Sequence, residues 1–156
     1  MGLHDEILVS FDRETAVVSR APGADLASKL ESRREWVWNS VSGDDPLDRN
    51  DPRTALSVVK ALSQAVDASE TWKLQSVGIV FGDVLAAMTG SEWVEVEDEY
   101  GRDAALRFAG PDDLIFPMTM ISKRVEAGDD VDPFSLWSTV AQSVFEIRER
   151  NEGDGQ

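Results

Sequence analysis

The hydrophobic pattern of the chain changes its period at Gly90, and this change constrains the fold more than any other feature of the sequence. Before Gly90, apolar residues recur every three or four positions, the spacing that places them on one face of an α-helix. After it they alternate, so that Val94 and Val96 point to one side of an extended chain and the glutamates between and after them to the other. A helical half followed by strands predicts an α+β domain.

Three helices are predicted before the strands and two after them. The first covers residues 25–41, and the second begins at Asp51-Pro52, where proline fits the first helical position, and runs to about residue 68. The pattern Asp67-x-x-Glu70 is typical of a capping box and predicts the start of a third helix, which ends at Gly90. Proline also opens the two C-terminal helices, over 117–128 and 133–150. Both are expected to pack on one face of the strands.

Three short strands are predicted between the helices, as an antiparallel meander. They contain residues 94–96, 104–108 and 114–116. If Val94 and Val96 face the same core as Leu106, the first turn must have an odd number of residues, such as Glu99-Tyr100-Gly101. Residues 24–150 are expected to form one domain, preceded by an N-terminal arm or hairpin over 1–23 and followed by a frayed tail over 151–156.

The composition excludes several classes of function. The 30 acidic residues against 15 Lys and Arg give a net charge of -15, which repels nucleic acids and anionic membranes and attracts basic proteins. Cysteine is absent and His4 is the one histidine, so a thiol nucleophile, a Ser-His-Asp triad within the chain and a cysteine-ligated metal are excluded. No cofactor motif is present, so we expect no cofactor, and a non-catalytic role is favoured over an enzymatic one without excluding it. The acidic start, without an apolar secretory run, favours a cytoplasmic location.

The most concentrated feature is the acidic stretch from Glu92 to Asp103, for which three interpretations stay open. It could be a solvated strand face, its repulsion relieved by nearby arginines and lysines. A row of carboxylates could also hold a hard cation such as Ca²⁺ or Mg²⁺, although the spacing is not that of a calcium-binding loop. The third interpretation is a docking surface for a basic partner.

Two features of the third helix also need an explanation. Asp83 lies in its most apolar stretch and is expected to pair with an arginine or to act as a buried functional acid. Gly78 and Gly82 lie four residues apart on one face, where each costs about 1 kcal/mol relative to alanine. We expect a neighbouring helix or strand to approach closely there, within the chain or from a second one.

Residues 92–107 and 116–124, with the preceding Gly78-x-x-x-Gly82-Asp83, resemble a bacterial family catalogued as domain of unknown function 3806. The resemblance covers roughly residues 55–130. It implies a bacterial origin and a compact domain. Because the family brings no established activity, it supplies no catalytic residue.

The leading hypothesis is a non-catalytic protein-binding domain, of the immunity-protein or adaptor kind, whose partner is basic. An alternative is a hydrolase or small-ligand-binding domain with a cleft between the sheet and the Pro117 helix, and a third is that the acidity only serves solubility. The oligomeric state stays open. The candidate binding residues are Asp83, Glu95, Glu97, Asp98, Glu99, Tyr100, Arg102, Arg107, Ser122, Lys123 and Arg124.

Overall fold

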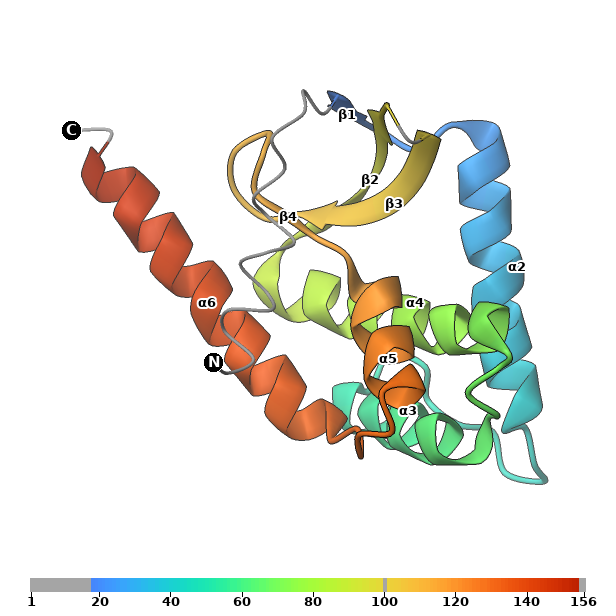
Figure 1. Ribbon diagram of the computed structural model, residues 1–156. Helices are drawn as coiled ribbons and strands as arrows, with labels where there is room; N and C mark the ends of the chain where they lie inside the picture. Colours follow the sequence, from blue (N-terminus) through green and yellow to red (C-terminus); the bar gives the residue numbers. More distant parts are fainter. Residues whose placement is uncertain (1–17, 100, 155–156) are drawn as a thin grey trace.

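The computed structural model describes residues 18–99 and 101–154, which form an α+β fold (Figure 1). Its helices are α2 (Ala24–Ser40), α3 (Pro52–Ala65), α4 (Thr71–Thr89), α5 (Pro117–Glu126) and α6 (Pro133–Asp154). Its strands are β1 (Val18–Arg20), β2 (Glu92–Asp98), β3 (Gly101–Arg107) and β4 (Leu114–Ile115). They pair antiparallel in the order β1-β2-β3-β4, so the sheet has one strand more than predicted. The rest of the predicted N-terminal arm or hairpin lies outside the described residues.

The local signals in the sequence account for most helix boundaries. Proline opens α3, α5 and α6, as expected, and left-handed glycines follow α4 (Gly90, φ 70°) and α5 (Gly128, φ 81°). The predicted capping box is wrong, because the Asp67 carboxylate accepts both the N–H and the hydroxyl of Ser69, and α4 starts at Thr71. Helix α6 continues to Asp154, into the segment expected to be a tail.

The predicted register of the hairpin between β2 and β3 is wrong by one residue. Val94 pairs with Ala105 and Asp98 with Gly101, so the turn has two residues, 99 and 100, instead of three. The prediction assumed that one face of the sheet is solvated. Instead Val94, Val96 and Ala105 are buried on one face together with Leu114, while Leu106 is buried on the opposite face, toward the helices.

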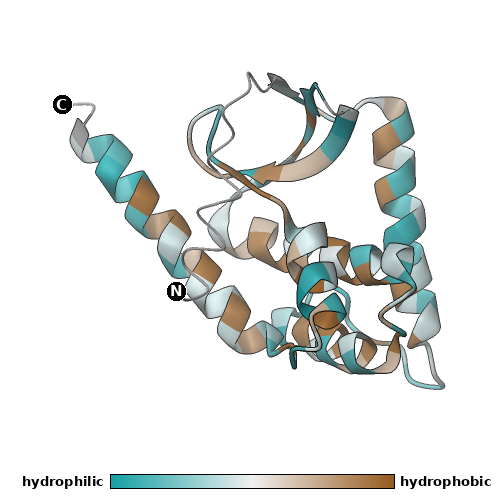
Figure 2. Cartoon of the chain, viewed as in Figure 1, coloured by the Kyte–Doolittle hydropathy of each residue, from teal (hydrophilic) through white to brown (hydrophobic). Residues whose placement is uncertain are grey.

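Helix α4 lies at the centre of the fold and contacts α2, α3, α5 and α6. The two C-terminal helices differ in detail from the prediction, because they pack chiefly on other helices: α5 crosses α4, and α6 contacts α3 and α4 (Figure 1). Apolar residues are concentrated on α4, whereas the outer half of α6 is mostly hydrophilic (Figure 2). Within the described segments, no helix combines the length and the apolar character that crossing a membrane requires.

Close packing within the chain explains the two glycines of α4. A Cβ atom at Gly78 would lie 2.5 Å from the Cα of Met118 and 2.7 Å from the carbonyl oxygen of Pro117, both in α5. At Gly82 it would lie 2.5 Å from the ring of Trp93 in β2. The expectation of a closely approaching helix or strand is therefore confirmed, and the neighbours are α5 and β2 of the same chain.

Candidate functional site

Arg20 contacts two carboxylates at the centre of the acidic strand, those of Glu95 and Glu97. Because β1 pairs with β2, Arg20 lies opposite Glu95 and donates to its carboxylate at 2.6 and 3.1 Å. Its guanidinium also reaches Glu97 at 3.0 Å. Glu95 is 5% exposed and accepts the N–H of Gly23 as well, and the Arg20 hydrogen bond holds the pKa of the Glu95 carboxyl below its ordinary value. At the centre of the row, Glu95 is a buried carboxylate paired with a half-exposed arginine. The Glu92 and Glu97 side chains are 64% and 43% exposed and lie beside Arg107 and Arg102, as the interpretation of a solvated face with nearby arginines predicts.

The other candidate residues of the hairpin spread around this pair. Arg102 is exposed and lies 3.8 Å from Glu97, while Arg107 pairs with Glu92 at 2.5 Å and also donates to Ser19. Asp98 ends β2, Glu99 is exposed in the turn, and Tyr100 lies outside the described residues. Within residues 18–99 and 101–154, no three acidic or histidine side chains come together as a metal site would require.

Asp83 forms a half-buried junction between α2, α4 and β2. Its carboxylate accepts two hydrogen bonds from Arg34, at 2.6 and 2.9 Å, and one from the indole N–H of Trp93 at 2.9 Å. This forked pairing uses the planar geometry of the guanidinium. Of the two roles considered for Asp83, the structure shows the arginine pair, and the residue joins three elements.

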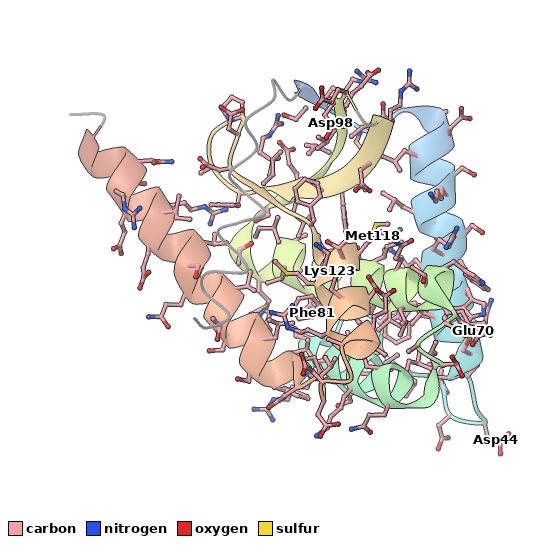
Figure 3. The ribbon with its side chains drawn as sticks, viewed as in Figure 1. Asp44, Glu70, Phe81, Asp98, Met118 and Lys123 are labelled. Atoms are coloured by element: carbon pink, nitrogen blue, oxygen red, sulfur yellow. The ribbon has the colours of Figure 1, made fainter. Side chains whose placement is uncertain are left out.

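The candidate residues of α5 do not join those of the hairpin. Ser122 is buried, Lys123 is exposed, and Arg124 donates to the carbonyl of Met120 at 2.9 Å. Figure 3 shows Lys123 on α5 and Asp98 at the far edge of the sheet. The structure therefore does not gather the acids, Arg102, Ser122 and Lys123 into the one cleft that a hydrolase would need.

A first acidic hollow lies in the loop between α2 and α3. Its volume is about 300 Å³, and Asp44, Asp45, Leu47 and Arg49 contribute to its lining. Arg49 pairs with Glu35 at 2.6 Å and lies over the ring of Trp38, which holds the loop against α2. Neither Asp44 nor Asp45 has an ion pair or hydrogen bond with the described part of the chain. Leu47, beside them, is 43% exposed.

A second acidic hollow, of about 380 Å³, lies in the loop between α5 and α6. Arg124, Asp129, Asp130 and Asp132 line it. The Asp132 carboxylate caps α6 by accepting the N–H groups of Phe134 and Ser135. Asp129 and Asp130 are exposed; the N–H of Asp129 donates to the carbonyl of Arg124, and neither carboxylate has an ion pair or hydrogen bond with the described residues. Phe134, in the first turn of α6, is 39% exposed.

Sequence reasoning missed these two loops and the partner of the acidic strand. The sequence shows the runs Asp44-Asp45 and Asp129-Asp130, but nothing local distinguishes them from ordinary polar turns. Arg20 follows the β-branched stretch that suggested a strand, and only the pairing of β1 with β2 shows which acids it neutralises.

Comparison with known proteins gives a family and a fold. A family model described as "Domain of unknown function (DUF3806)" matches residues 55–137, more than half of the chain and the region of the resemblance noted in the sequence. A crystal structure of a protein from Bacteroides thetaiotaomicron VPI-5482 is similar, with a TM-score of 0.64 and 16% identity, over 81% of this chain and 48% of that one. This chain thus spans about half the length of that protein, and the likeness concerns the fold alone. No relative was found among the curated proteins.

Proposed function

We propose that this chain, which belongs to the family described as Domain of unknown function (DUF3806), is a non-catalytic protein-binding domain whose partner presents a basic surface. The family description names no activity, so the proposal rests on the surface of this molecule. The acidic strand is the weaker candidate for the binding face, because Glu95 is buried against Arg20, which also contacts Glu97, and Arg107 pairs with Glu92. The binding face proposed here consists of the two acidic loops, residues 43–47 and 129–134, which we call the loop pair.

One observation carries the proposal: each loop combines two unpaired aspartates with an exposed large apolar side chain. Asp44 and Asp45 accompany Leu47, and Asp129 and Asp130 precede Phe134. Protein interfaces commonly use an apolar anchor within a polar rim, and charged rims steer the approach of a partner of opposite charge. The net charge of -15 extends this attraction beyond the contact surface.

The positions of the two loops allow one partner to contact both. Both lie at the lower end of the molecule in Figure 1, and Figure 3 shows Asp44 at the outer tip of the first loop. Helix α3 follows the first loop directly and contacts both α5 and α6, which the second loop connects. The loop pair therefore flanks α3 on one end of the domain.

The test compares charge changes of equal size in two places. One variant carries Asp44→Asn and Asp45→Asn, and the control carries Glu149→Gln and Glu152→Gln, exposed positions on the outer half of α6. Each raises the net charge by two units. Immobilised wild-type protein and both variants are used to capture proteins from a lysate, and affinities for the captured partner are then measured by calorimetry.

We expect a basic partner that the wild type and the α6 control bind alike and that the loop variant binds about tenfold more weakly, equivalent to about 1.4 kcal/mol. Leu47→Ser should weaken binding without altering its salt dependence, because it removes apolar contact and no charge. Equal weakening by the loop and control variants would show that net charge alone attracts the partner and would refute the loop pair as the site.

A further inference from the structure

A small cavity, separate from the loop pair, lies where α2, α4, β3 and the start of α5 meet. Its volume is about 40 Å³. The buried side chains of Leu30, Ile79 and Met118 form its apolar floor and belong to one hydrophobic cluster. Figure 3 shows Met118 at the end of α5 nearest the sheet. The cavity therefore opens onto the seam between the sheet and the helices.

Three cations line this cavity, in a chain with 15 lysines and arginines against 30 acids. Lys29 and Arg33 lie one turn apart on α2, and Arg102 reaches the cavity from β3. Asp103 is the single carboxylate in the lining, and its Oδ1 accepts the N–H of Ala104. The lining has an excess of two positive charges, opposite in sign to the molecule as a whole.

These cations have N–H donors that can still bind a further partner. Lys29 has no ion pair or hydrogen bond within residues 18–99 and 101–154. Arg33 uses one N–H for the carbonyl of Trp72, at 3.1 Å, and lies over its ring, which leaves the other donors of its guanidinium. The Nε of Arg102 lies 3.8 Å from Glu97, too far for a hydrogen bond, and its side chain is 66% exposed. The amide of Gln75, which also lines the cavity, has no described partner.

We propose that this cavity binds a small organic carboxylate with a short apolar tail. Like charges held close together repel each other, and an anion between them removes this cost. The exposed cations stand at the mouth, so the carboxylate would lie there, hydrogen-bonded by Lys29, Arg33 and Arg102, with Gln75 as an uncharged donor. The buried apolar floor takes the tail. This pairing of apolar contact with a few polar groups is usual in ligand sites.

The size of the cavity limits the tail. A water needs about 10–15 Å³ of such space, so about 40 Å³ admits about three heavy atoms. A butyrate-like chain matches this limit, whereas acetate leaves the floor uncovered and longer chains extend into solvent. The proposal does not depend on the protein-binding function, because none of its residues belongs to the loop pair.

The test titrates the full chain with acetate, propionate, butyrate, hexanoate and inorganic phosphate, and follows the NMR signals of the Gln75 side-chain amide and of the arginine Nε–H groups. The variants are Lys29→Gln and Arg102→Gln, whose side chains are exposed and take no part in the core. The matched control is Lys60→Gln, which removes one exposed positive charge from α3, away from the cavity.

We expect affinity to rise about fourfold per methylene from acetate to butyrate and then to level off. Each cavity variant should bind butyrate about fivefold more weakly, while Lys60→Gln matches the wild type. Phosphate should bind more weakly than butyrate, since it leaves the apolar floor unused. The proposal would be overturned if the affinity did not change with the length of the carboxylate or if phosphate bound more tightly than butyrate. It would also be overturned if Lys29→Gln and Lys60→Gln lost the same amount of butyrate affinity.

Discussion

Replacing Gly78 by alanine tests the packing that positions α5. Two physical effects predict opposite changes in the free energy of unfolding. In an exposed helix, alanine in place of glycine stabilises by about 1 kcal/mol, because glycine loses more backbone entropy on folding. Gly78, however, lies in the middle of α4 directly beneath α5. Helix propensity therefore predicts a more stable protein and packing predicts a less stable one.

The structure decides which effect is larger. The new Cβ would lie 2.5 Å from the Cα of Met118, and ordinary van der Waals contact begins at 3.4 Å, so α5 would have to withdraw by about 0.9 Å. The obstructing atoms belong to backbone, which cannot rotate away as a side chain can. A gap of this size removes about a quarter to a half of the dispersion energy between facing atoms, and overpacking typically costs about 1–3 kcal/mol. Taking about 3 kcal/mol for a backbone clash and subtracting about 1 kcal/mol for propensity, we expect a net loss of about 2 kcal/mol.

The assay is urea denaturation followed by tryptophan fluorescence, with a thermal melt beside it. Gly78→Ala should lower the urea midpoint at an unchanged m-value and lower Tm by about 4–8 °C. Gly153→Ala is the matched control, because Gly153 is helical and a Cβ there would meet nothing within 4 Å. It should leave stability unchanged or raise it slightly. If Gly78→Ala were as stable as Gly153→Ala, the close approach of α4 and α5 would be refuted.

Two further predictions concern the ion pairs. Asp83→Asn should lower the free energy of unfolding by about 2 kcal/mol, because three charge-assisted hydrogen bonds weaken. The control Asp112→Asn, at an exposed turn, should have no effect. Equal urea midpoints for the two variants would contradict this prediction. The pKa of Glu95 is lowered in the folded state by its Arg20 hydrogen bond, so its ionisation stabilises the fold above its ordinary pKa of 4.5 and this contribution is lost as pH falls through the lower, folded value. The difference in urea midpoint between wild type and Glu95→Gln should therefore be largest at pH 7 and shrink as the pH falls below 4.5, and a difference that stays constant with pH would refute this role.

The helices could be predicted because their signals are local. Pro52, Pro117 and Pro133 fit the first helical turn, and Gly90 takes the left-handed conformation that ends α4. The hairpin register could not be predicted in the same way. Alternation shows which residues share a face of a strand, but it does not show whether the other face is solvated. Because both faces of this sheet are buried, Val94 and Leu106 are both buried but belong to different hydrophobic clusters on opposite faces.

The candidate site was less predictable than the fold, because its contacts join elements distant in sequence. An arginine partner was expected for Asp83 since an isolated carboxylate in an apolar stretch needs donors, yet nothing local identifies Arg34, 49 residues away. The acidic strand suggested a free surface because Arg20 is 75 residues from Glu95. The cavity cations were hidden for the same reason, since Lys29 and Arg102 meet only in the folded chain.

The net charge of -15 opposes the binding of polyanions more strongly than the binding of small anions. At physiological ionic strength, interactions between exposed charges are largely screened beyond about 8 Å. A nucleic acid or an anionic membrane spans many such lengths and meets the whole excess of acids. A small carboxylate bound in the cavity would contact Lys29, Arg33 and Arg102, with Asp103 as the one carboxylate of the lining, whereas the aspartates of the two loops line other hollows. The cations of α2 and β3 can thus make the local charge at the cavity positive, although the net charge of the chain is negative. The loop pair keeps the negative charge that the proposed basic partner requires.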